Sequence, residues 1–79
     1  MKRTDELAAE IVTRLQRSAC PMAIFITPQG VMALRTNETH SEAMIAFAFE
    51  RYPTGLIGTY TEQANIQWIR DDVNSYLET

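Results

Sequence analysis

An almost continuous run of apolar residues from Pro21 to Arg35 is interrupted by the tetrapeptide Thr27-Pro28-Gln29-Gly30. Proline presets φ at the second position of a turn and glycine suits the last, so these residues predict a tight turn between two short strands. A three-residue connection would pair Thr27 with Val31, although a shift of one residue would exchange the sheet faces. In this register one face carries Met22, Ile24, Ile26, Met32 and Leu34, and the other carries Ala23, Phe25, Thr27, Val31, Ala33 and Arg35.

Upstream of this hairpin, apolar residues recur at the spacing of an amphipathic helix. They fall within roughly 140° of the helix circumference at ~100° per residue, and charged residues occupy the opposite side. Thr4 is a candidate N-cap, and Pro21 should end the helix by about Ala19 or Cys20. The apolar positions are Leu7, Ala8, Ile11, Val12, Leu15 and Ala19.

A second helix is predicted from about His40 to Tyr52. Thr39 and Glu42 have the spacing of a capping box, and the sequence Pro53-Thr54-Gly55 should end the helix. Its apolar residues spread over roughly 200°, which is wider than one packing face requires. We therefore expect this helix either to lie between two layers or to form a subunit contact. The apolar positions are Met44, Ile45, Phe47, Ala48, Phe49 and Tyr52.

Residues 56–61, LIGTYT, are rich in β-branched and aromatic types and predict a third strand. A third helix is predicted over Glu62–Glu78, with Thr61 as its cap and a narrow apolar stripe. The alternative interpretation makes residues 65–70 a fourth strand followed by a short terminal helix. The stripe consists of Ile66, Ile69, Val73, Tyr76 and Leu77.

This order of elements predicts one small α+β domain over residues 1–79. The connection between the second and third strands is long enough for a crossover, so the third strand can run parallel to the second and pair with the first. We expect a three-stranded, mostly antiparallel sheet of order 2-1-3 with the first two helices on one face. The face that carries Phe25 and Arg35 must then be covered by the third helix or by a second chain.

Charge limits the classes of partner. The chain has a net charge of −3: residues 1–37 hold five basic and three acidic groups, and residues 38–79 hold two basic and seven acidic groups. Binding to a phosphate backbone depends on basic side chains, so an acidic chain is better suited to a basic protein surface. An inhibitor that occupies such a surface fits this description. The alternative is a nucleic-acid-binding regulator that uses Arg3, Arg14 and Arg17 on the first helix.

Several observations bear on compartment and assembly. Cys20 is the only cysteine, so no disulfide can form within the chain, which fits a reducing compartment. Lys2 and Arg3 are followed by acidic residues rather than by the apolar segment of a signal peptide. The apolar run at 43–49 is far shorter than the roughly 20 residues that span a bilayer. We expect a cytoplasmic protein that does not engage membranes and, because so short a chain buries little surface, a homodimer.

The candidates for catalysis or metal binding are few. Cys20 and His40 are the only thiol–imidazole combination, but Cys20 lies near the C-terminal end of a helix, where the dipole disfavours a thiolate. Residues 38–42, ETHSE, hold three potential metal ligands with no second segment to complete a site. Asp71 and Asp72 would point about 100° apart on a helix and so should not share a site. We expect no cofactor and no enzymatic activity; the alternative is an enzyme whose site is completed across an oligomer interface.

Trp68 is the most informative residue for partner binding. On the predicted helix it lies opposite the apolar stripe and beside Asp71 and Asp72, which is typical of an interface anchor that selects a basic partner. It would instead be a core residue if 65–70 formed a strand or if the helix were covered on both sides. The sequence thus predicts a non-enzymatic protein–protein interaction or regulatory module. Its candidate partner contacts are Trp68, Asp71, Asp72, Phe25 and Arg35.

Overall fold

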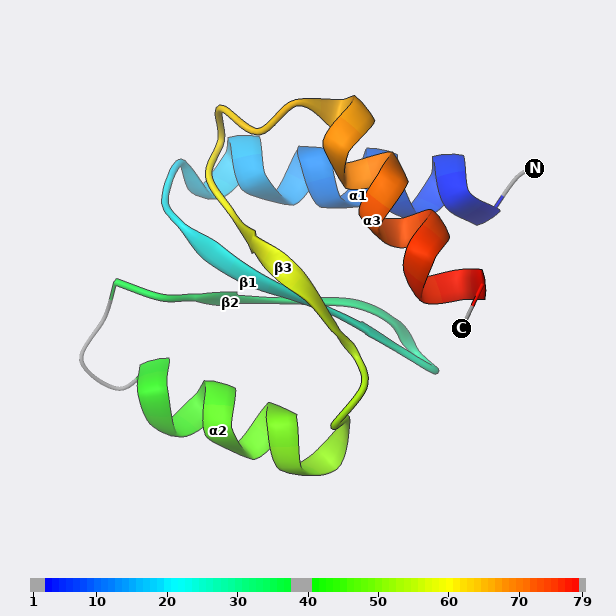
Figure 1. Ribbon diagram of the computed structural model, residues 1–79. Coiled ribbons are helices and arrows are strands. Elements are labelled where there is room, and N and C mark those ends of the chain that lie inside the picture. Colours follow the sequence, from blue (N-terminus) through cyan, green and yellow to red (C-terminus); the bar gives the residue numbers. More distant parts are fainter. Residues whose placement is uncertain (1–2, 38–40, 79) are drawn as a thin grey trace.

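The computed structural model describes residues 3–37 and 41–78 (Figure 1). The predicted order of elements and the α+β class are confirmed, and the three strands form one antiparallel sheet of order β2-β1-β3. The elements are α1 (Arg3–Ser18), β1 (Met22–Thr27), β2 (Gly30–Arg35), α2 (Ser41–Arg51), β3 (Leu56–Tyr60) and α3 (Ile66–Glu78).

The helices cover both faces of the sheet. Helices α1 and α3 lie on one face and α2 lies on the other (Figure 1). The expectation that the first two helices share a face is therefore wrong. All six residues of the central strand β1 are buried. Because successive side chains of a strand point to opposite faces, a strand that is apolar throughout requires cover on both sides.

The hairpin between β1 and β2 has a shorter turn than predicted. Thr27 pairs with Gly30, so the connection is Pro28-Gln29 and every residue of β2 is shifted by one position from the predicted register. The Thr27 hydroxyl bridges this turn, accepting from the Gln29 amide at 3.2 Å and donating to the Gly30 carbonyl at 2.9 Å. Gly30 has a φ of 124°, which a side chain would disfavour. The shift places Val31 and Ala33, rather than Met32 and Leu34, on the face of Ile24 and Ile26.

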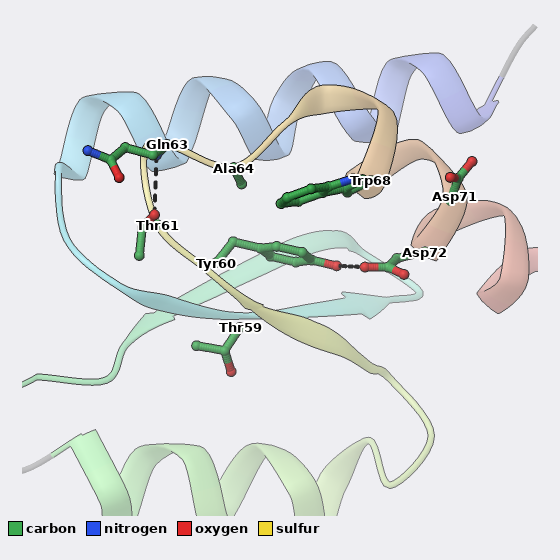
Figure 2. Close-up of a pocket in the computed structure, with 8 residues that line it drawn as sticks. All are labelled: Thr59, Tyr60, Thr61, Gln63, Ala64, Trp68, Asp71 and Asp72. Carbon is green, nitrogen blue, oxygen red and sulfur yellow. Dashed lines mark hydrogen bonds between the residues drawn. The ribbon is translucent and has the colours of Figure 1, made fainter.

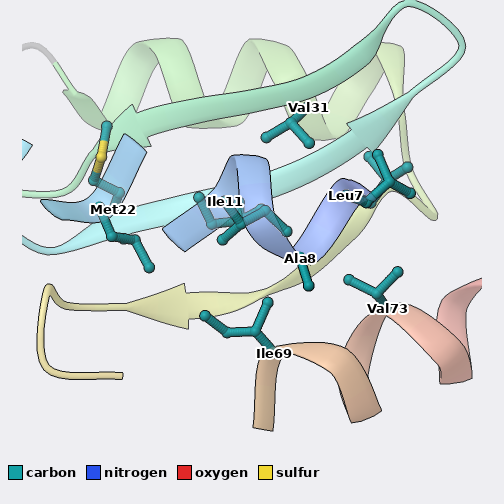
Figure 3. Close-up of a cluster of buried hydrophobic side chains, with 10 residues drawn as sticks. Leu7, Ala8, Ile11, Met22, Val31, Ile69 and Val73 are labelled. Atoms are coloured by element: carbon teal, nitrogen blue, oxygen red, sulfur yellow. The ribbon is translucent and has the colours of Figure 1, made fainter. Parts of the chain in front are cut away.

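The larger core lies between the sheet and the helix pair α1 and α3 (Figure 3). The buried positions of both helices fall on the predicted apolar stripes, but three predicted members of those stripes are exposed: Ala19, Ile66 and Leu77. Because side chains from four elements, α1, β1, β2 and α3, pack into one cluster, this layer is the main source of hydrophobic stabilisation. Its buried members are Leu7, Ala8, Ile11, Leu15, Met22, Ile24, Ile26, Val31, Ile69 and Val73.

The smaller core lies between the sheet and α2. Phe25 is fully buried there and meets Phe49 edge to face, with ring centroids 5.6 Å apart and an interplanar angle of 82°. The prediction that α3 or a second chain covers Phe25 is wrong, because α2 covers it. Phe25 is therefore a core residue of the single chain and cannot serve as a partner contact. The other members of this cluster are Ala23 and Ala48, with Met32, Leu34, Ile45, Tyr52 and Leu56 packed against them.

Strand β3 contains a bulge that directs its side chains. Ile24 pairs with Gly58 but Phe25 pairs with Leu56, so Ile57 is the additional residue. Leu56 therefore packs against the smaller core and Ile57 against the larger one, whereas an unbroken register would pair Ile57 with Phe25 and exchange the two faces. Just before the strand, a Cβ on Gly55 would lie 2.8 Å from the Ile26 carbonyl oxygen. The close approach of Gly55 to the backbone of β1 therefore requires glycine.

Helix boundaries depart from the predictions at two places. Helix α3 begins at Ile66 rather than Glu62, because Asn65 caps it: the backbone N–H of Gln67 donates a 2.7 Å hydrogen bond to the side-chain oxygen of Asn65. Residues 65–70 therefore do not form a strand. Thr4 lies inside α1 and donates to Asn74 of α3 at 2.7 Å instead of capping. The predicted capping box includes Thr39, which lies outside the described residues.

Candidate functional site

A hollow of about 640 Å³ lies where β3 leads into α3 (Figure 2). We refer to it as the Trp68 depression. Two aromatic side chains and two carboxylates line it, together with small and polar residues, and none of the lining residues is basic. Its members are Thr59, Tyr60, Thr61, Gln63, Ala64, Trp68, Asp71 and Asp72.

Trp68 is 65% exposed, so the interpretation of this residue as part of the core is wrong. The helical phase explains the exposure, because the neighbouring Ile69 and the later Val73 carry the buried stripe of α3. Trp68 extends from α3 toward the same hollow that Tyr60 enters from β3 (Figure 2). A large, rigid aromatic surface is thus offered to solvent beside a second ring.

Tyr60 joins the strand to the helix. Its hydroxyl donates a hydrogen bond to the Asp72 carboxylate (Figure 2). Burial raises the pKa of Tyr60, and the hydrogen bond to Asp72 and the negative charge of that carboxylate raise it further. Gly58 makes room for this position, since a Cβ there would lie 2.8 Å from the Tyr60 hydroxyl oxygen. The Tyr60 phenol therefore keeps its proton and links β3 to α3 at the border of the depression.

The two aspartates occupy different parts of the depression. Asp72 is directed at Tyr60. Asp71 is exposed and accepts a 3.2 Å hydrogen bond from the side-chain nitrogen Nε2 of Gln67. They point in different directions, as expected for helix neighbours, but both line the hollow (Figure 2). Each carboxylate thus has its own partner, as the helical spacing predicts, although the hollow is wide enough to be bordered by both.

This arrangement is suited to a cation. Aromatic faces attract Lys, Arg or ligand cations through their ring quadrupoles, with about 0.5–2 kcal/mol per contact. Carboxylates at the rim add charge-assisted hydrogen bonds. An arginine guanidinium fits both features best, because it is planar, stacks on aromatic rings and forms paired bonds to carboxylates.

Arg35, the remaining predicted contact, lies elsewhere. It is exposed at the end of β2, and the register places Met22 between it and Tyr60. Two strand spacings separate Arg35 from Tyr60, or ~10 Å. Of the five predicted contact residues, the structure brings together Trp68, Asp71 and Asp72.

Tyr60 and Gly58 escaped the sequence analysis. The position of the tyrosine ring depends on the β3 register and on the start of α3, and neither is encoded in a local pattern. A glycine two positions before an aromatic residue in a strand was the one available signal, since such a glycine leaves space on the same sheet face.

The candidates for chemistry find little support. Cys20 is half-buried against the larger core, and His40 lies outside the described residues. Within residues 3–37 and 41–78 no group of three His, Cys, Asp or Glu side chains could hold a metal ion. Glu38 also lies outside these ranges.

The arginine face of α1 carries mixed charge. Arg14 lies 3.0 Å from Glu10, and both border a second hollow with Arg17. Arg3 is exposed at the start of the helix. An acidic residue within this stripe lowers the positive potential that a phosphate backbone would require, so the structure does not favour the nucleic-acid alternative.

An apolar groove lies on the opposite face of the sheet, between α2 and β2. Its volume is about 400 Å³, and Phe47 and Met44 stand beside it with 65% and 50% of their surfaces exposed. The wide apolar face of α2 is thus packed on the sheet along one side and uncovered along the other. The groove is lined by Met32, Leu34, Ala43, Met44, Phe47 and Ala48.

The chain matches no known family, and neither a characterised protein nor a solved structure shows significant similarity to it. None of the helices in the described part of the chain combines the length and the apolar character needed to cross a membrane.

Proposed function

We propose that this chain is a non-enzymatic protein-binding module that recognises an arginine side chain on a basic surface of another protein. The observation that carries the proposal is the Trp68 depression, in which two aromatic rings and two carboxylates border one hollow with no basic residue among them. Such a site would be filled by a cation supplied from outside the chain.

The depression is supported by rigid elements rather than by a long loop. Ile69 and Val73 anchor α3 in the larger core, and the contact from Tyr60 to Asp72 joins the helix to the sheet. A site held in this way loses little conformational freedom on binding, which favours affinity. If the basic surface of the partner also binds nucleic acid, the module would inhibit that activity by occupying the same surface.

The test uses a fluorescently labelled peptide with one central arginine flanked by glycines, and it measures binding by anisotropy. Trp68→Ala should weaken binding about tenfold, the effect of losing one cation–π contact of about 1.4 kcal/mol. Asp71→Asn should weaken it by a smaller factor that shrinks as salt is added. Glu78→Gln is the matched control, because this exposed acidic residue lies on the same helix outside the hollow. Equal affinity for wild type and Trp68→Ala would refute the proposal.

A further inference from the structure

We infer that two copies of this chain associate through the outer edge of β2, so that the two sheets continue into one antiparallel sheet of six strands. In the described part of the chain β2 pairs with β1 alone, which leaves its other edge without a strand partner. Three features around this edge identify the occupant as a second copy.

The first feature is the hydrogen-bonding pattern of β2. Thr27 and Gly30 close the turn and therefore form a bonded pair, and bonded pairs alternate with non-bonded ones along an antiparallel ladder. The 3.1 Å bond from the Thr36 amide to the Pro21 carbonyl fits this alternation at the far end of the hairpin. Val31 and Ala33 are then non-bonded positions, and their backbone groups face away from β1.

The other edge of the sheet is less suitable for pairing. Strand β3 has the bulge at Ile57, and bulges disrupt the regular row of donors and acceptors that edge-to-edge pairing needs. Strand β2 pairs with β1 in an unbroken register over its full length. Of the two edges, β2 is the one that a further strand fits.

The second feature is the apolar groove beside this edge. A two-fold axis that passes beside the outer edge of β2, at the middle of the strand, would bring the groove of one copy against that of the other. The exposed Phe47 and Met44 of each copy would then lie against apolar surface of its partner. Apolar residues that flank an open strand edge are what a paired sheet would bury.

The third feature is charge, and it distinguishes a second copy from an unrelated strand. On the other sheet face, Glu10, Arg14 and Arg17 of α1 border a hollow of about 470 Å³ that reaches Ala33 of β2. The same two-fold axis would run the two α1 helices in opposite directions, so that Glu10 of each copy faces the arginines of the other. The reversed copy can set Glu10 of each chain toward an arginine of the other, whereas a uniformly charged partner of either sign would meet a like charge within this stripe.

This assembly leaves the Trp68 depressions free. They lie beside β3, at the two outer ends of the six-stranded sheet. If the proposed function is correct, the dimer would present two arginine sites to one partner and gain avidity. The dimer itself does not depend on that function, because its surfaces are separate from the depression.

Sedimentation equilibrium of the full chain over a range of concentrations tests the inference. We expect a species of twice the 9.0 kDa chain mass. Phe47→Glu should raise the dimer dissociation constant about a hundredfold, since each copy loses a buried aromatic contact and gains a charge. Ala46→Glu adds the same charge to an exposed position of α2 outside the groove, so it is the matched control and should remain dimeric. Circular dichroism establishes that both variants are folded.

A charge reversal provides a second, independent test. Arg17→Glu should weaken the dimer about tenfold or less, and the double variant Glu10→Arg with Arg17→Glu should recover affinity, because both copies carry both changes. A wild-type chain that is monomeric at every concentration overturns the inference. A dimer that is equally stable in Phe47→Glu and Ala46→Glu also overturns it, as does association that requires an added foreign peptide.

Discussion

The two faces of the sheet differ in how completely they are covered. On one face, two helices enclose a cluster of ten buried residues. On the other face, a single helix covers three buried residues, and Met44, Phe47 and Phe49 stand partly in solvent. The first face accounts for most of the hydrophobic stabilisation. The second retains apolar surface beyond what the single chain needs, which is the usual sign of an interaction site.

The largest expected effect concerns the helix that joins the larger core to the Trp68 depression. Ile69→Ala removes a fully buried side chain and should reduce the free energy of unfolding by about 2–5 kcal/mol. Leu77→Ala on the same helix alters a residue that is 38% exposed and should cost roughly 1 kcal/mol or less. Urea denaturation of both variants measures the difference. Similar losses would contradict the difference in burial between Ile69 and Leu77 within the stripe.

The second effect tests the close approach of the backbone before β3 to the backbone of β1. Gly55→Ala places a methyl group against the Ile26 carbonyl and should destabilise the fold by about 1–3 kcal/mol, because backbone cannot move aside as a flexible side chain does. Gly58→Ala meets the movable end of the Tyr60 side chain and should cost less. It should instead displace the phenol from Asp72, which NMR signals of the tyrosine ring would reveal. Retention of the Tyr60 ring position in Gly58→Ala would show that this glycine is not required for the site.

A pH-dependent effect follows from Tyr60. Its pKa in the folded state is raised above the unfolded value of about 10, so the folded state holds this proton more tightly. The resulting stabilisation is complete below about pH 10 and is lost as the pH rises through the folded-state pKa. The midpoint of urea unfolding should therefore fall more steeply above about pH 10 in wild type than in Tyr60→Phe. Parallel profiles would show that the fold does not raise the pKa of Tyr60, by burial or by the contact with Asp72.

The smallest effect concerns the uncovered side of α2. Met44→Ala changes a half-exposed residue and should alter the stability of the isolated chain by within about 0.5 kcal/mol at high dilution. If the chains associate through this face, the same variant should lose stability at high protein concentration, where dimers contribute to folding. Thermal unfolding at two concentrations separates these contributions. A large loss at high dilution would place Met44 in the core of the single chain.

The sequence was informative where a pattern repeats and uninformative where a single contact decides. The stripes of α1 and α3 repeat every three to four residues, so their buried faces and the exposure of Trp68 on the polar side could be anticipated. The β2 register could not, because Pro28-Gln29-Gly30 is compatible with two turn lengths and the Thr27 hydroxyl selects one of them. The bulge at Ile57 also has no local sequence signal, although it turns Leu56 from the face of the larger core to the face of the smaller one.

The candidate site shows the same division. Trp68, Asp71 and Asp72 were identifiable from their positions on one helix, which are set by local geometry. Tyr60 was not, because it meets Asp72 only after β3 has paired with β1 and α3 has packed on the sheet. Phe25 was wrongly predicted as a partner contact. An apolar residue on a strand can face a partner or a helix of its own chain, and the sequence pattern does not distinguish the two.

The most direct measurement of the central claim is an NMR titration of the wild-type chain with the arginine peptide and with a peptide of the same length that carries uncharged citrulline. Trp68 is the only tryptophan, so its indole N–H gives a single signal that reports on the depression. We predict that this signal and those of the Tyr60 ring shift in a saturable manner with arginine and remain unchanged with citrulline. Equal shifts with both peptides, or shifts confined to other residues, would contradict the account.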